Sequence, residues 1–139
     1  MILYTASKDG DKAKTFHQKC NGYKMTLVLV ETTKGERFGG FTTQTWDGNC
    51  IKKLDNNAFV FNLNKRRIYD IVKNEYAIGG YPKFGPVFFG CQIRVFDDFF
   101  INGGTTCLRG LNYNTNRNYE LNNGEQKFLI KDIEVYGIY

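Results

Sequence analysis

The sequence predicts a mainly β domain: a two-sheet antiparallel β-sandwich with a few short helices. Most of its apolar runs are too short for helices and are bounded by Gly, Asn, Asp or Pro. Only one stretch, near the start, has clear helical periodicity. Hydrophobic residues make up 42% and aromatic residues 16% of the 139 residues, which is enough to fill one core. We therefore expect a single domain over residues 1–139.

The first predicted element is a helix in SKDGDKAKTFHQKCNG, residues 7–22. Ser7 or Asp9 is suited to cap its start, and Asn21-Gly22 is suited to end it. Helical spacing places four residues on one face: Ala13, Phe16, His17 and Cys20. We expect this face to be buried against a sheet, because lysines occupy most of the opposite face.

Short strands joined by turns follow. Residues 25–32 and 36–44 form a predicted hairpin, in which Gly39-Gly40 indicates a bulge or the close approach of another backbone. A loop is predicted over 46–57 and a turn over 80–86. Further strands are predicted at 58–63, 67–72, 86–90 and 92–96.

The last predicted strand is KFLIKDIEVYGIY, residues 127–139. Its apolar side changes phase at Lys131-Asp132, which predicts a bulge there. Because apolar residues then fill both parities, we expect an interior strand. Before it, residues 101–126 are rich in Gly and Asn and predict a long irregular segment.

The net charge of +5 suits an acidic partner surface. Basic residues are scattered apart from NKRR (64–67) and IKKL (51–54), and neither run alternates with aromatic residues, which argues against nucleic-acid binding. The longest apolar run, LVLV (27–30), is too short to span a membrane. The four cysteines are widely spaced and form no CxxC motif, so we expect free thiols in a cytoplasmic protein.

The His17 and Cys20 pair is weighed as a catalytic dyad, as metal ligands and as part of a helix interior. Its local spacing is unusual for a Cys/His enzyme, and no second histidine is present to complete a metal site. The sequence DGDK (9–12) lacks the later oxygen ligands of a calcium loop and is interpreted as a helix cap. Asp97-Asp98 is interpreted as a solvated loop end. No catalytic, metal or cofactor-binding residue is assigned.

The order of five segments carries a resemblance. ILYTASKDGDKAKTFHQKC, TLVLVETTKGERFGGFT, NAFVFNL, EYAIGGYPKFGPVFFG and FLIKDIEVYGI follow one another along nearly the whole chain. Together they resemble the TLDc domain family, in forms common among protist members. The resemblance implies a two-sheet β-sandwich in which His17 and Cys20 belong to a helix of the fold. It also implies that the chain lacks the N-terminal segment that precedes the domain in larger members.

The resemblance further implies a non-catalytic module that binds and regulates the vacuolar proton-pumping ATPase and is linked to oxidative-stress resistance, with no cofactor. Lys65, Arg66 and Arg67 form the densest basic cluster and are the candidate partner contact. Three alternatives stay open: a structural subunit of another large assembly, a small-molecule or sugar-binding sandwich using GLNYNTNRNYE (110–120), and an enzyme using Cys20 or Cys107.

Overall fold

Two antiparallel sheets, each of six strands, form the fold in a computed structural model that describes residues 1–90 and 92–138. Sheet I has the order β1 (Ile2–Thr5), β12 (Ile130–Gly137), β2 (Thr26–Thr32), β3 (Arg37–Thr42), β5 (Phe59–Asn62) and β6 (Arg67–Asp70). Sheet II has the order β11 (Lys127–Phe128), β10 (Gly104–Thr105), β9 (Ile93–Phe96), β8 (Phe84–Phe88), β7 (Tyr76–Gly79) and β4 (Lys52–Leu54). The predicted fold class is confirmed.

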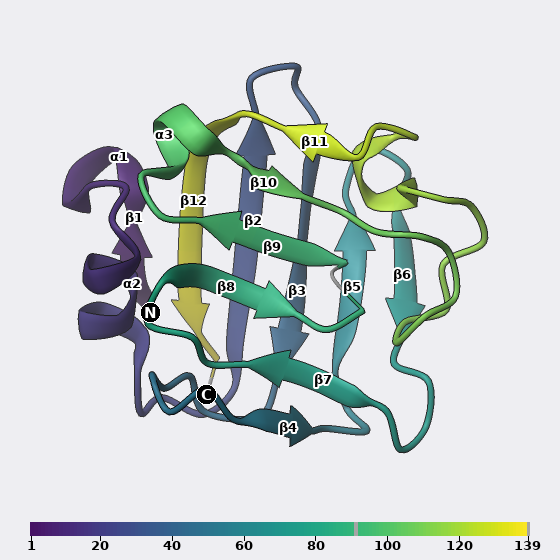
Figure 1. Ribbon diagram of the computed structural model, residues 1–139, viewed down its shortest axis with the longest axis horizontal. Coiled ribbons are helices and arrows are strands. Elements are labelled where there is room, and N and C mark those ends of the chain that lie inside the picture. Colours follow the sequence, from purple (N-terminus) through teal and green to yellow (C-terminus); the bar gives the residue numbers. More distant parts are fainter. Residues whose placement is uncertain (91, 139) are drawn as a thin grey trace.

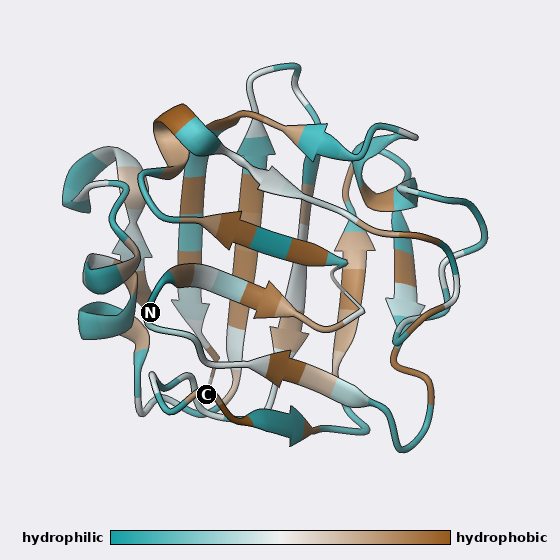
Figure 2. Ribbon diagram, viewed as in Figure 1, coloured by the Kyte–Doolittle hydropathy of each residue, from teal (hydrophilic) through white to brown (hydrophobic). Residues whose placement is uncertain are grey.

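The two sheets face each other with their strands crossing (Figure 1). Val28 and Val30 of β2 and Phe88 of β8 are fully buried in the core between them. Four short helical segments complete the fold: α1 (Ala6–Asp9), α2 (Ala13–Cys20), α3 (Phe99–Asn102) and the 3-10 helix η1 (Glu120–Asn122). The helices α1 and α2 lie beside β1 and are mostly hydrophilic, whereas hydrophobic residues gather on the strands (Figure 2).

The prediction of one helix from about Asp9 to Cys20 is wrong at its start, because two helices, α1 and α2, occupy this stretch. Gly10 separates them with a φ of +103°, a conformation that glycine adopts readily. Ser7 lies within α1 and does not cap α2. The predicted inner face is confirmed, since Ala13, Phe16, His17 and Cys20 are all buried.

The predicted hairpin is confirmed as β2 and β3, whose pairing runs from Thr26 opposite Thr42 to Glu31 opposite Arg37 without a register shift. Gly39-Gly40 is therefore a place of close approach and not a bulge. A Cβ on Gly39 would lie 1.8 Å from the main-chain oxygen of Val28. A Cβ on Gly40 would lie 2.4 Å from the ring of Phe88 in sheet II.

The terminal strand agrees with its prediction in part, because Lys127–Phe128 form the separate strand β11 of sheet II and only Ile130–Gly137 form β12 of sheet I. The β12 pairing with β2 shifts register between Ile130 and Asp132, at the predicted bulge, and β12 lies between β1 and β2. The predicted loop over 46–57 is wrong in part, because it contains the edge strand β4. The segments that form β1, β7 and α3 were not assigned from the sequence.

Candidate functional site

The predicted contact residues lie in the tight turn between β5 and β6. The N–H of Arg66 donates to the carbonyl of Leu63 at 3.2 Å, and Arg66 adopts a φ of +55°. The Asn62 side-chain oxygen accepts a hydrogen bond from the N–H of Lys65 at 2.8 Å, and this second hydrogen bond stabilises the turn. The structure thus brings the three basic residues together on one rigid turn.

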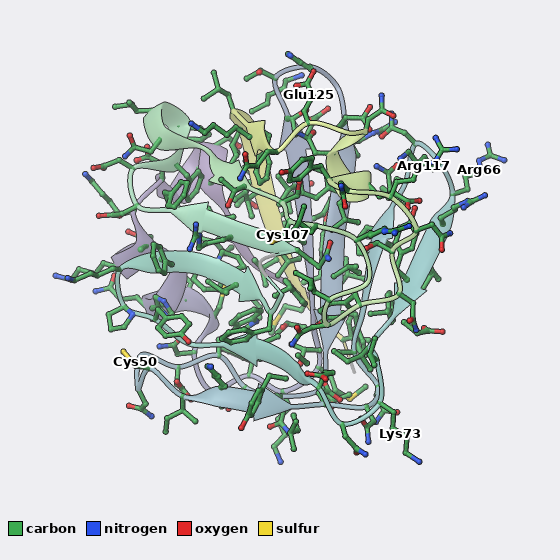
Figure 3. All side chains as sticks on the ribbon, turned by 45° about the vertical axis from the view of Figure 1, so that its right-hand side comes forward. Cys50, Arg66, Lys73, Cys107, Arg117 and Glu125 are labelled. Atoms are coloured by element: carbon green, nitrogen blue, oxygen red, sulfur yellow. The ribbon has the colours of Figure 1, made fainter. Side chains whose placement is uncertain are left out.

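The three residues do not have the same environment. The ammonium of Lys65 is half-buried and donates to the carbonyl of Glu120 at 2.9 Å, so it holds the turn against η1. Arg66 and Arg67 are exposed, and neither forms an ion pair with any other residue that the structure describes. Figure 3 shows Arg66 extending away from the body of the domain. Of the predicted cluster, the two arginines are the residues available to a partner.

A buried carboxylate supports this turn from below. Glu120 accepts hydrogen bonds from the Tyr69 hydroxyl, from the N–H of Asn116 at 2.8 Å and from the N–H of Arg117 at 2.9 Å. Burial opposes ionisation of Glu120, but these hydrogen bonds outweigh it and lower its pKa. Burial and the bond to Glu120 together raise the pKa of Tyr69. Sequence reasoning missed this network because Tyr69 lies 51 positions from Glu120 along the chain.

The outer face of sheet I, turned away from sheet II, is apolar next to the basic turn. The pairing of β2, β3 and β5 places Leu27, Phe41 and Phe59 in one cross-strand row. The next row contains Leu29, Gly39, Phe61 and, on β6, Ile68. The rings of Phe41 and Phe59 stack at 5.2 Å between centroids. In a two-sheet sandwich such outward rows are ordinarily polar.

The residues of these rows on β2, β5 and β6 line a hollow of about 400 Å³. Its lining is apolar except at the basic turn: Leu27, Leu29, Phe59, Phe61, Asn62, Leu63, Arg66, Arg67 and Ile68. Ile68 is 64% exposed and Leu63 is 47% exposed, so apolar surface reaches the solvent directly. Sequence reasoning missed this surface. The available signal was that LVLV and AFVFN are apolar at both parities, which predicts strands with two apolar faces.

The opposite side of the hollow is acidic. Leu29 also borders a smaller hollow of about 150 Å³, which is lined by Glu31, Arg37, Asp132 and Glu134. A Glu134 oxygen accepts from the Tyr136 hydroxyl at 2.9 Å, and this bond raises the pKa of Tyr136. The outer face of sheet I therefore runs from acidic at β12, through apolar at β2 to β5, to basic at the β5–β6 turn.

The His17 and Cys20 pair has a structural environment. The Nε2 of His17 lies 2.7 Å from the carbonyl of Tyr81 and 2.9 Å from that of Phe84. Because carbonyls only accept, Nε2 carries the proton and ties α2 to Tyr81 and to the first residue of β8. Cys20 is fully buried, and burial raises the pKa of its thiol to about 12. A thiol in this state is not an effective nucleophile at neutral pH.

The other residues weighed as sites are distributed through the fold. In the Asn-rich segment, the Tyr113 hydroxyl donates to the carbonyl of Ala77 at 2.7 Å and the Asn112 amide donates to that of Tyr76, so both hold the segment to β7. Cys50 and Cys107 lie far apart (Figure 3) and are free thiols, whereas Cys91 lies outside the described residues. Across residues 1–90 and 92–138, no group of three or more His, Cys, Asp or Glu side chains is placed to hold a metal ion.

No helix in the described part of the chain is long and apolar enough to cross a membrane. In curated proteins, the chain is 28% identical over 93 residues to TBC1 domain family member 24 of Xenopus tropicalis, covering 63% of this chain and 16% of that protein. It is 29% identical over 62 residues to MTOR-associated protein MEAK7 of Danio rerio, covering 45% of this chain and 14% of that protein. The chain thus matches a small part of each relative's length.

The family comparison spans the whole sequence. A family model described as the TLDc domain matches residues 1–139. This match agrees with the five ordered segments and with the two-sheet fold described above. The chain therefore belongs to the TLDc domain family.

Proposed function

We propose that this chain is a non-catalytic, cytoplasmic interaction module that docks on a large protein assembly through the outer face of sheet I. The observation that carries the proposal is the apolar hollow beside two exposed arginines without ion-pair partners among the described residues. A contiguous exposed apolar patch with a polar rim is typical of a protein-binding surface. Membership of the TLDc family favours the vacuolar proton-pumping ATPase as the assembly.

The non-catalytic part of the proposal has separate support. Cys20 is buried with a raised pKa, and the His17 ring is engaged by two main-chain carbonyls. Neither residue is arranged as an activated nucleophile or as its base. The family's link to oxidative-stress resistance is then an effect of docking and does not need thiol chemistry on this chain.

The name of one relative, MTOR-associated protein MEAK7, also favours association with other proteins. A permanent structural subunit of another assembly is the second candidate, and the same exposed face favours it equally. The two candidates differ in stability of association: a docking module exchanges on and off its assembly, whereas a subunit co-purifies at fixed stoichiometry through size exclusion.

Surface plasmon resonance against the purified soluble sector of the proton pump tests the proposal. We expect wild-type binding, and a loss of about tenfold or more in affinity for Ile68→Asp, because the charge lies in the apolar hollow. Ile101→Asp is the matched control, since Ile101 is 77% exposed on α3 and does not line the hollow. Equal binding by Ile68→Asp and wild type would remove sheet I from the interface, and no binding by wild type would remove the pump.

A further inference from the structure

We infer that the partner places an amphipathic α-helix in the hollow of sheet I. This inference rests on the proposed docking function and deepens it. The helix has an apolar stripe that meets β2, β3 and β5, acidic residues on the flank that meets Arg66 and Arg67, and basic residues on the flank that meets Glu134. One such helix is complementary to the whole outer face of sheet I, which is basic at the β5–β6 turn, apolar from β2 to β5 and acidic at β12.

The pairing of the sheet favours a helix over an extended peptide. An extended peptide binds by adding a strand to an unpaired sheet edge. The hollow lies on a sheet face: its strands β2 and β5 are paired on both sides, and the edge strand β6 borders it with the side chains of Arg67 and Ile68. The main-chain groups of β2 and β5 are engaged in the sheet, so only side chains are available to a partner on this face. A helix meets such a face with its own side chains and leaves both backbones satisfied.

The size of the apolar zone matches a short helix. The second apolar row crosses four strands, β2, β3, β5 and β6, which corresponds to about 14 Å across the sheet. A helix with its side chains is about 10–12 Å wide. Along the strands the two apolar rows are about 7 Å apart, and two helical turns cover about 11 Å. Two turns with apolar residues at i, i+3, i+4 and i+7 therefore cover the zone.

One position on this apolar face has no side chain of its own and is covered by a neighbouring ring. Gly39 lies in the middle of the second apolar row, between Leu29 and Phe61. A Cβ at this position would lie 2.9 Å from the Phe61 ring, which shows that the ring leans over Gly39. The stacked Phe41 and Phe59 rings form the neighbouring wall. The Phe61 ring, which lines the hollow, therefore covers Gly39, and the helix contacts this ring there.

The charges on the two sides of the hollow determine which flank of the partner helix is acidic and which is basic. Arg66 and Arg67 border the hollow on the β6 side, and neither has a carboxylate within ion-pair distance among the described residues. On the β12 side, Glu134 and Glu31 line the adjoining hollow and likewise form no ion pair within the described chain. Complementary charges on a partner steer encounter and fix its register. A helix with one acidic and one basic flank satisfies both sides at once.

Two stapled 14-residue helical peptides test the inference by fluorescence anisotropy. Both have leucines at i, i+3, i+4 and i+7; the Glu/Lys peptide has glutamates along one flank and lysines along the other, whereas the Lys/Lys peptide has lysines along both. We expect the wild-type chain to bind the Glu/Lys peptide about tenfold or more tightly than the Lys/Lys peptide. The double variant Arg66→Glu, Arg67→Glu should reverse this order. Ile68→Asp should weaken binding of both peptides, and Ile101→Asp should leave it unchanged.

Several results would overturn the inference. Equal affinity of wild type for both peptides would show that charge order does not select the occupant. No binding of either peptide, while Ile68→Asp still loses the proton pump, would exclude the helix but keep the docking function. If both assays fail, the docking function falls as well. Sedimentation of wild type, but not of Ile68→Asp, with phosphatidylserine vesicles in the absence of peptide binding would assign the surface to a lipid headgroup layer.

Discussion

Asp97 accepts a hydrogen bond from the main-chain N–H of Ala13, 2.8 Å away, although the two residues lie 84 positions apart. Ala13 is the first residue of α2, and Lys12 at the N-cap position provides no side-chain cap. Asp97 follows β9 and supplies this cap from another part of the fold. Its negative charge also lies at the positive end of the helix dipole. The contact joins α2 to the end of sheet II.

Removing this cap should destabilise the domain. We expect Asp97→Ala to lower the free energy of unfolding by about 1 kcal/mol, as the loss of an N-cap does. Urea denaturation followed by tryptophan fluorescence measures the change. Asp98→Asn is the control, because it removes the surface pair with exposed Lys12 while Asn tolerates the left-handed φ of +52° at this position. Equal losses for the two variants would show that Asp97 does not act as the cap.

This contact illustrates where sequence reasoning reached its limit. The buried face of α2 follows a local periodicity and was predicted, as were the β2–β3 hairpin and the bulge in β12. The predicted cap in DGDK (9–12) was wrong, because Asp97 approaches α2 only through the tertiary fold. Short strands such as β4 and β7 were missed for the same reason: three or four residues carry too little pattern, and their pairing defines them.

The candidate site was predictable in part. The basic cluster was visible because charge is a local property, but the different environments of Lys65 and Arg66 depend on distant Glu120. The apolar face of sheet I depends on pairing that brings Leu29, Gly39 and Phe61 into one row. The residues of that row come from different segments of the sequence. The only local sign of the apolar face was that β2 and β5 have apolar residues at odd and even positions alike, which indicates strands that are apolar on both faces.

Gly39 should tolerate no side chain. A Cβ there would lie 1.8 Å from the Val28 oxygen, and a neighbouring backbone cannot move as a side chain can. We expect Gly39→Ala to cost roughly 3 kcal/mol or more of unfolding free energy. Gly48→Ala is the control, because its nearest neighbour is the Pro82 ring at 3.5 Å, and its change should stay within about 0.5 kcal/mol. An unchanged denaturation midpoint for Gly39→Ala would contradict the close approach of β2 and β3.

Glu120 should make stability depend on acid pH. The pKa of Glu120 is lower in the folded state than in the unfolded state, where it is about 4.3. Ionised Glu120 therefore stabilises the fold fully above the unfolded pKa, and this stabilisation is lost as the pH falls through the lower folded pKa. Glu120→Gln should therefore lose roughly 1–3 kcal/mol at pH 7. The difference from wild type should shrink below about pH 4 in urea titrations at several pH values. Glu125→Gln, at an exposed ion pair with Lys34, should show little pH-dependent difference. A pH-independent difference for Glu120→Gln would mean that its ionisation is not coupled to folding.

The basic turn should act on the rate of association, with Arg66 and Arg67 contributing and Lys65 not. Arg66 and Arg67 are exposed at the rim of the hollow, where charges steer encounter more than they hold the complex. The double variant Arg66→Glu, Arg67→Glu should slow stopped-flow association with the Glu/Lys peptide by roughly tenfold at low salt and weaken its salt dependence. Lys65→Met should instead leave association nearly unchanged and lower stability, because the Lys65 ammonium holds Glu120 of the same chain. Unaltered association of the double variant at low salt, or slowing by Lys65→Met alone, would show that the partner does not approach over the two arginines.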